Sequence, residues 1–366
     1  MTQPANILTE TLSAVTPVPN ERIQKAQAHL DSLTKPQGSL GRLEEIAARL
    51  AAMHPAGKPR IHKRGVFLFA ADHGVVAEGI SAYPQAVTAQ MVCNFLNGGA
   101  AINVLSRHGG AGVTVIDMGV NHDFASDLAL VAKKIANGTG NIRCGPAMTC
   151  DQAERALMAG VELAAQAKKD GFDLLGTGDM GIGNTTPSAA ILSVLSGRPP
   201  AQTTGHGTGI DNAVLQHKIA VIEDALRINQ PDPADPVDVL AKVGGFEIAG
   251  IAGLCIGAAS QNLPVVLDGV ISIAGAAIAH RMNPNIGDYL FASHNSIEPG
   301  CRVGFDLLSL DPLLDFKMRL GEGTGSVLAM HAIEAAVKIY NEMTTVEQAG
   351  VASKSDSFNK TIKAEP

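Results

Sequence analysis

The sequence of 366 residues contains no tryptophan and few other aromatic residues. Aromatic side chains make up 4% of the chain, whereas hydrophobic residues of all kinds make up 46%. β-Sandwich cores rely on bulky side chains, but close-packed helices on a parallel sheet tolerate small ones. The many glycines and alanines therefore favour an α/β protein over a β-sandwich.

The sequence also lacks clusters of lysine or arginine, and its net charge is −7. This argues against nucleic acid or an anionic membrane as a partner. Two apolar runs, at 248–259 and 269–279, are each too short to span a bilayer. Gly253 and Gly257 form a G-x-x-x-G pattern in the first run, which indicates close helix packing in a soluble protein. Residues 1–20 have neither the basic nor the apolar part of a secretory signal, so we expect a soluble cytoplasmic protein.

Metal-binding and disulfide patterns are absent from the sequence as well. The five cysteines are odd in number and form no C-x-x-C, which is typical of reduced cytosolic thiols. The eleven histidines show no H-x-x-H or H-E-x-x-H spacing. We therefore expect neither a metal site nor a cofactor.

Apolar runs of strand length alternate with helical periodicity along the chain. This alternation predicts an α/β fold with a Rossmann-like parallel sheet of about six strands, flanked by helices. We expect a large substrate-binding domain at 61–309 and a small helical domain built from 1–60 and 310–366, with a disordered tail after 344. The predicted strands are 65–71, 112–118, 130–132, 173–176, 265–268 and 289–293. The predicted helices are 21–54, 83–106, 150–169, 187–195, 210–228, 247–259 and 327–340. Ser39 is a candidate N-cap within the first of these, and Thr149 with Gln152 is a candidate capping box for 150–169.

The stretch RLGEGTGS at 319–326 carries the strongest catalytic signal. It places Glu322 between glycines just before a helix, and Ser326 is a candidate N-cap of that helix. Glycines let a backbone turn sharply and approach a ligand, so Glu322 is a candidate general base. The alternative is a surface loop with a capping acid.

Two further glycine-rich loops are candidates for binding an anion. Residues 176–187 join a predicted strand to a helix, and Pro187 suits the first helical position. Asn184, Thr185 and Thr186 add side-chain donors there, although a flexible crossover loop remains possible. Residues 205–209 repeat the glycine pattern, and Lys218 in the next helix could neutralise a phosphate or be a solvated charge.

The segment 293–300 places hydroxyl, imidazole and amide groups after the last predicted strand. A Ser-His-Asp triad stays open, although the sequence has no G-x-S-x-G. Dinucleotide binding is the main rival hypothesis. However, the loop at 72–75 is DHGV rather than G-x-G-x-x-G, and no Walker A motif is present.

Taken together, these stretches resemble the nicotinate-nucleotide–dimethylbenzimidazole phosphoribosyltransferase family of cobalamin biosynthesis. The resemblance spans nearly the whole chain in order. It rests on KPQGSLGRLE (35–44), ADHGV (71–75), YPQAVTAQM (83–91), GDMGIGNTTP (178–187), KVGGFEIAGIAG (242–253), LPVVLDG (263–269), SHNSIEPG (293–300) and RLGEGTGS (319–326).

The resemblance implies transfer of ribose 5-phosphate from nicotinate mononucleotide to 5,6-dimethylbenzimidazole, giving α-ribazole 5′-phosphate and nicotinate. It also implies a homodimer in which the small domain of one subunit closes the site of the other. The preferred acceptor stays open, since benzimidazole, adenine or a phenol also offers a nucleophile. The alternative to this enzyme is a nucleotide-binding oxidoreductase or regulatory module.

The same resemblance assigns site residues. Glu322 matches the catalytic base of the family. The residues matched to the lining of the benzimidazole pocket are Tyr83, Met91 and Leu320. Three positions depart from the family pattern: Asp179 stands where Glu is usual, His206 where Arg is common and Cys301 where His is common. The residues matched to substrate binding around the nucleotide are Asp179, Gly181, Asn184, Thr185, Lys218, Ser293 and Ser296.

Overall fold

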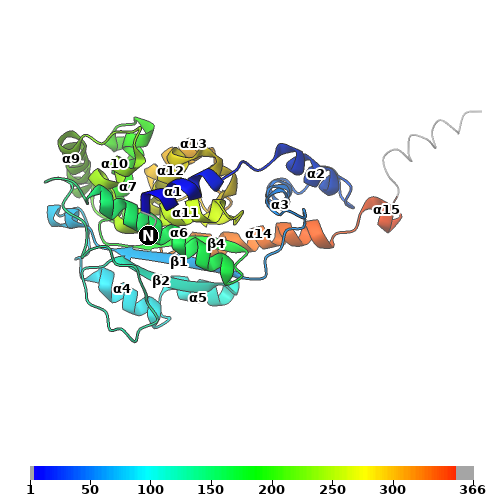
Figure 1. Ribbon diagram of the computed structural model, residues 1–366, viewed down its shortest axis with the longest axis horizontal. Helices are drawn as coiled ribbons and strands as arrows, with labels where there is room; N and C mark the ends of the chain where they lie inside the picture. The colour runs from blue at the N-terminus through cyan, green and yellow to red at the C-terminus, as the bar shows by residue number, and fades with distance from the viewer. Residues whose placement is uncertain (1–3, 352–366) are drawn as a thin grey trace, which may run out of the picture. The chain divides into compact units, whose positions relative to one another are not determined.

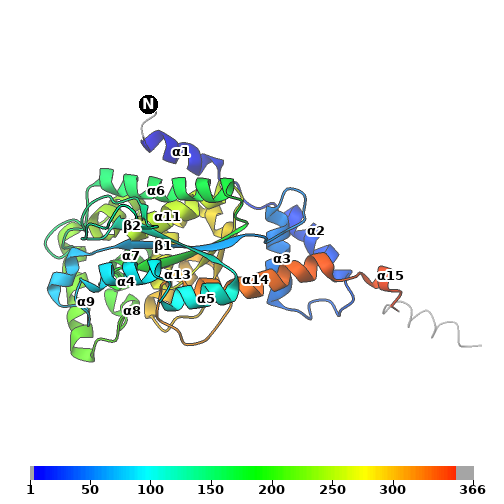
Figure 2. The same ribbon diagram turned by 90° about the horizontal axis from the view of Figure 1, so that it is seen from below.

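The computed structural model describes residues 4–351, and the chain divides into two compact units (Figures 1 and 2). The first unit is Met1–Pro17 with His62–Met330, and the second is Val18–Ile61 with His331–Pro366.

A single parallel sheet forms the centre of the first unit. Its strand order is β3-β2-β1-β4-β5-β6, and every neighbouring pair is parallel. This is the order of a Rossmann-like doubly wound sheet, so the predicted fold class is confirmed. The strands are β1 Arg64–Ala71, β2 Gly112–Gly119, β3 Val131–Ala132, β4 Leu174–Met180, β5 Val265–Leu267 and β6 Leu290–Ala292.

Helices cover both faces of this sheet. Figure 2 shows α6 on one side of β1 and β2, and α4 and α5 on the other side. The helix α11 packs on α6, and a side chain at Gly253 would collide with the carbonyl of Leu157 in α6. The glycine spacing in α11 therefore serves close helix packing, as predicted. The helical segments of this unit are α1 Pro4–Ala14, η1 Gly74–Glu78, α4 Val87–Leu96, α5 Ala101–Gly109, α6 Cys150–Lys169, α7 Thr185–Ser196, α8 Pro200–Thr203, α9 Asn212–Asn229, α10 Pro236–Val243, α11 Phe246–Ala259, α12 Val270–Met282, η2 Pro284–Tyr289 and α13 Pro299–Leu308.

The second unit is helical. It holds α2 (Asn20–Asp31), α3 (Arg42–Met53), the end of α14 (Thr324–Glu342) and α15 (Val346–Ala349). The two sequence segments of this unit are joined by a hydrogen bond in which the Thr34 N–H donates to the Thr344 carbonyl at 3.0 Å.

The unit boundaries differ from the predicted domain boundaries at both ends of the chain. The helix α1 belongs to the first unit because it packs on α6 and α11 there, and Asn283 donates to the Leu12 carbonyl at 2.9 Å. The start of α14 also belongs to the first unit, because it is bonded to the end of β5. The predicted disordered tail falls mostly outside the described residues.

Two predicted helix caps are wrong and one is confirmed. The N-cap of α3 is Gly41 rather than Ser39, and the Glu44 carboxylate accepts from the Leu40 N–H at 2.9 Å. Ser326 lies inside α14, which begins at Thr324. The capping box of α6 is present as predicted, with reciprocal bonds between Thr149 and Gln152.

Several predicted elements end in different places. The predicted helix 83–106 is two helices, α4 and α5, because Gly98 has a positive φ of 76° and ends the first. The strand β4 runs on to Met180, so residues 176–180 of the predicted glycine loop are strand. The helix α7 starts at Thr185, which places Pro187 at its third position instead of its first.

Within the described residues, no helix is both long and apolar enough to cross a membrane. The five cysteines are free thiols. Burial raises the pKa of the Cys255 thiol to about 12.

Candidate active site

A cavity of about 590 Å³ opens at the carboxyl ends of β4, β5 and β6. This is the edge at which parallel α/β sheets bind their ligands. Its size suits a small-molecule site. The residues that line it are Tyr83, Ala101, Leu105, Asp179, Asn184, Thr185, Gly207, Thr208, Gly269, Val270, Ile271, His294, Ser296, Glu298, Met318, Arg319, Leu320, Gly321 and Thr324.

Six of the predicted site residues line this cavity, although they come from four separate stretches of the sequence. They are Tyr83, Asp179, Asn184, Thr185, Ser296 and Leu320. Tyr83 and Leu320 are 52% and 57% exposed, so apolar surface lies open at the cavity.

The predicted base, Glu322, lies beside the cavity next to Gly321. Its side chain is 6% exposed, and its carboxylate accepts from the Ile102 N–H at 3.2 Å. Burial raises the pKa of Glu322, while that hydrogen bond lowers it and the charge of Asp268 raises it further. A carboxylate with a raised pKa is suited to taking a proton near neutral pH.

Asp179 is the second buried carboxylate at the cavity. A methyl group built on Gly321 would lie 3.4 Å from both of its carboxylate oxygens, so Asp179 faces the loop that carries Glu322. The Asn184 amide donates to Asp179 at 2.9 Å. The sequence predicted this amide as a donor to a bound anion, but in the structure it also binds Asp179. The pKa of Asp179 is well above its usual range because of burial and the nearby charge of Asp268.

Lys218 lies directly behind the cavity wall. Its side chain is buried, and its ammonium donates to the Thr185 hydroxyl at 2.6 Å. Burial lowers the pKa of Lys218 to about 8, although the Glu298 charge raises it. Lys218 is therefore not a solvated surface lysine. Its ammonium contacts Thr185, the first residue of α7.

Besides Glu322 and Lys218, three more predicted residues do not line the cavity. Ser293 is buried and bonded to His294 at 2.9 Å. A side chain at Gly181 would collide with the Ala71 carbonyl, so this glycine allows close contact between strand ends. Met91 lies on α4 and is partly exposed.

Two departures from the family pattern lie away from the cavity lining. The His206 ring is exposed and bonded to the Ile210 carbonyl at 2.8 Å, while its neighbours Gly207 and Thr208 line the cavity. Cys301 is buried in α13, and burial raises the pKa of its thiol.

The structure adds polar residues that the sequence did not single out. Glu298 accepts from the Gly207 N–H at 2.9 Å, and Arg319 donates to the Gly207 carbonyl at 2.9 Å, so both hold the 205–209 loop. Asp268 is fully buried at the end of β5 and is bonded to the start of α14. A lone carboxylate after the apolar run 263–267 was the signal that could have identified Asp268.

Within residues 4–351, no group of three or more His, Cys, Asp or Glu side chains has the arrangement of a metal site. A second cavity, of about 570 Å³, lies in the helical unit. Its lining includes Arg22, Lys25, His29 and Lys58 and none of the predicted site residues.

The sheet and its acidic cavity define an α/β enzyme that acts on a small polar molecule at the carboxyl ends of its strands. The phosphoribosyltransferase family model matches residues 15–351. A nicotinate-nucleotide–dimethylbenzimidazole phosphoribosyltransferase from Geobacter sulfurreducens is 57% identical over 346 residues, which cover 94% of this chain and 98% of the relative. One from Chlorobaculum parvum is 53% identical over 347 residues, covering 95% of this chain and 98% of the relative.

A solved structure, that of CobT from Thermus thermophilus, superposes with a TM-score of 0.87 at 47% identity, covering 91% of this chain and 99% of that one. The chain therefore belongs to the nicotinate-nucleotide–dimethylbenzimidazole phosphoribosyltransferase family. These matches do not support the alternative of a nucleotide-binding oxidoreductase or regulatory module.

Proposed function

We propose that this enzyme transfers ribose 5-phosphate from nicotinate mononucleotide to 5,6-dimethylbenzimidazole, with Glu322 as the general base. The observation that carries the proposed role of Glu322 is its placement: a buried carboxylate of raised pKa beside the cavity, on a loop fixed at the edge of the sheet. The names and near-complete coverage of the relatives support the choice of substrates.

In this reaction one benzimidazole nitrogen attacks C1′ of the ribose as the bond from C1′ to the nicotinate nitrogen breaks. The electron pair of the broken bond returns to the cationic pyridinium ring, which leaves as neutral-ring nicotinate. The other benzimidazole nitrogen gives its proton to Glu322. Attack from the face opposite the leaving group inverts C1′ and produces α-ribazole 5′-phosphate.

The charges around the cavity suit this substrate pair. Burial raises the pKa of both Asp179 and Glu322. A bound pyridinium and the positive charge that develops on the ribose would favour the ionised form of these carboxyl groups, which complements that charge. The phosphate binds at Lys218 and Thr185, at the start of α7, because a cation and helix N–H groups there favour an anion. The benzimidazole binds against Tyr83, Met91 and Leu320. The part of the site that binds the nucleotide is formed by Gly181, Asn184, Ser293 and Ser296.

We also propose a cytoplasmic homodimer. Free thiols at all five cysteines suit a reducing compartment. Two exposed apolar residues of the cavity lining, Tyr83 and Leu320, together with Phe316 at 63% exposure, suit coverage by a second copy. Analytical ultracentrifugation of the wild type and Phe316→Glu tests this, and a monomeric wild type would contradict it.

The experiment that tests the function mixes nicotinate mononucleotide with dimethylbenzimidazole and follows both by chromatography. We expect equimolar loss of the two and release of nicotinate. Glu322→Gln should lower kcat by about 10²-fold or more with little change in melting temperature, because it keeps the volume and removes the proton acceptor. The residual rate should persist, since the variant still positions both substrates.

The matched control is Glu162→Gln, on the outer surface of α6, where the carboxylate is 58% exposed and pairs with Lys133. This variant should keep the wild-type kcat. Wild-type turnover in Glu322→Gln would show that Glu322 is structural, and Asp179 would then be the next candidate for the base.

A further inference from the structure

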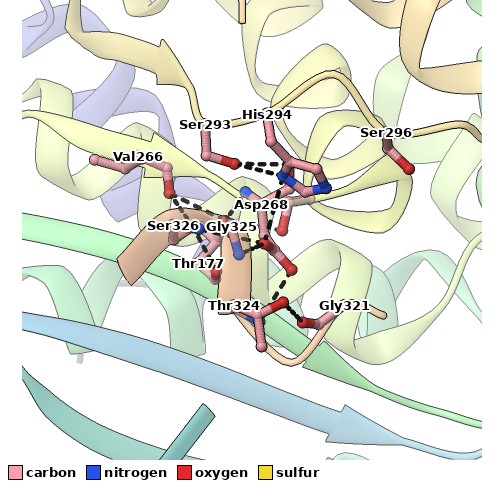
Figure 3. A network of polar contacts seen from close by, with 12 residues as sticks. Thr177, Val266, Asp268, Ser293, His294, Ser296, Gly321, Thr324, Gly325 and Ser326 are labelled. Carbon is pink, nitrogen blue, oxygen red and sulfur yellow. Dashed lines mark hydrogen bonds and ion pairs between the residues drawn. The ribbon is translucent and has the colours of Figure 1, made fainter. Parts of the chain in front are cut away.

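Asp268, the residue that follows β5, binds the start of α14 (Figure 3). One carboxylate oxygen accepts from the Gly323 N–H at 2.9 Å. The other accepts from the Gly325 N–H at 2.7 Å and the Ser326 N–H at 3.3 Å. Free N–H groups at a helix start normally bind water, a capping side chain or an anion. Here a buried carboxylate of the same chain occupies them.

The first turn of α14 has a second attachment to the sheet, through Ser326. Its hydroxyl lies 3.0 Å from the Thr177 carbonyl in β4 and 2.9 Å from the Val266 carbonyl in β5, and donates to them. In Figure 3 these contacts lie beside Asp268, so two strands hold the same turn. Gly325 has no room for a side chain, because a Cβ there would collide with the His294 ring.

These attachments fix an unusual backbone at the residue just before them. Glu322 has a φ of +62°, in the left-handed region that residues other than glycine rarely adopt. Such a conformation persists only when the surroundings impose it. The next N–H along the chain, that of Gly323, is one of the donors to Asp268. On the other side, the Glu322 carbonyl lies only 2.6 Å from where a Cβ on Gly178 would be.

We propose that Asp268 is a positioning residue for Glu322. By holding the N–H groups of Gly323 and Gly325, it keeps the Glu322 backbone left-handed and its carboxylate beside the cavity, where it accepts from the Ile102 N–H. The buried His294 ring lies next to this carboxylate, with its Nδ1 4.0 Å from the nearer Asp268 oxygen. This inference rests on the proposed function, in which Glu322 is the base.

The test combines Asp268→Asn with Glu322→Gln in a double-mutant cycle. Asparagine keeps the volume of the side chain and one acceptor oxygen. Its NH₂ group, however, faces the Gly323 N–H, and because both groups are donors this hydrogen bond is lost. We expect kcat to fall by about 10²-fold, the scale set by a misplaced catalytic group. The KM for nicotinate mononucleotide should stay within about threefold, because the nucleotide contacts are elsewhere. The double variant should be no slower than Glu322→Gln within about twofold, since residues acting through one another are non-additive.

The matched control is Asp117→Asn at the end of β2. Asp117 is also buried and accepts two backbone N–H groups, those of Gly119 and Val120, but it does not line the cavity. It should leave kcat within about twofold. If Asp268→Asn fails to fold, Asp268→Glu replaces it, because it keeps the charge and displaces the acceptor by one methylene.

An activity-independent measurement completes the design. Hydrogen exchange of the 321–326 amides should be at least about tenfold faster in the Asp268 variant than in the wild type or Asp117→Asn. Unchanged exchange would overturn the attachment itself. The positioning of Glu322 would be overturned if exchange were faster but the kcat losses of Asp268→Asn and Glu322→Gln were fully additive. It would also be overturned if exchange were faster and KM rose with no loss of kcat. If the wild type releases no nicotinate, the proposed function fails instead, and the exchange result alone decides whether Asp268 holds the loop.

Discussion

Replacing Lys218 with methionine should separate binding of the nucleotide phosphate from the chemical step. Lys218 is buried against Thr185, and its pKa is lowered from 10.5 to about 8 by burial. Lowering the pKa from 10.5 to about 8 corresponds to roughly 3 kcal/mol, which is the net cost of keeping this ammonium charged when Glu298 is the nearby anion and no phosphate is bound. In the proposed complex, the substrate phosphate at the start of α7 is the anionic partner of Lys218.

The expected change in KM follows from this contact. A hydrogen bond to a charged group contributes about 1.5–3 kcal/mol, or about 10- to 150-fold in binding. Lys218→Met should therefore raise the KM for nicotinate mononucleotide by about 10- to 100-fold. The kcat should change by less than about threefold, because the contact exists in both the ground state and the transition state.

The pH dependence provides an independent check in the wild type. With a pKa of about 8, Lys218 is mostly charged at pH 7 and mostly neutral at pH 9, so the KM should rise roughly tenfold over that interval. Lys218→Met should lose this dependence. The control Lys242→Met, which removes a surface ion pair with Asp238, should keep it.

Stability should move in the opposite direction from binding. The folded-state pKa is below the unfolded value, so the unfolded chain binds more protons between about pH 8 and 10.5, and the free energy of unfolding rises with pH there. Lys218→Met removes the buried charge and should not lower the melting temperature at pH 7. A flat KM profile in the wild type together with a normal KM in the variant would refute the placement of the phosphate.

Two further predictions concern the framework of the site. Gly325→Ala places a methyl group on the His294 ring, so it should cost about 1–3 kcal/mol in urea unfolding and lower kcat, whereas Gly145→Ala, with open space around it, should do neither. Thr149→Ala removes the N-cap of α6 and should destabilise the protein by about 1 kcal/mol without changing kcat, and an unchanged unfolding midpoint would contradict the role of the cap.

The fold was largely predictable because its signals are local. Apolar runs such as 65–71 and 112–118 are buried along most of their length, and the first is followed directly by the polar residues Asp72 and His73. The helix α12 was not predicted, since residues 270–279 are buried all round and show no polar face from which a helical period could be read. The α4–α5 break was missed because helical periodicity hides a short turn at Gly98.

The candidate site was predictable only in part, because its residues meet through contacts far apart in the sequence. Glu322 and Thr185 stood out from their glycine-rich surroundings, and both lie at or beside the cavity. The glycines themselves were interpreted too simply. Gly323 and Gly178 make room for strand and loop backbone to meet, whereas the prediction assigned such glycines to ligand approach. The partners of Asp268 lie 55 to 58 residues further along the chain, a pairing that no local pattern reveals.

The two helix starts at this sheet edge differ in what their N–H groups bind, and that difference determines where each part of the substrate fits. A helix start carries about half a positive charge, which favours a nearby anion. At α14 the N–H groups are already bound by Asp268, so the helix start offers little to a phosphate. At α7 no side chain caps the helix, and Thr185 and the buried Lys218 ammonium lie at its start. We therefore propose that the phosphate of the substrate binds at α7, with the cationic ring and the ribose between Asp179 and Glu322.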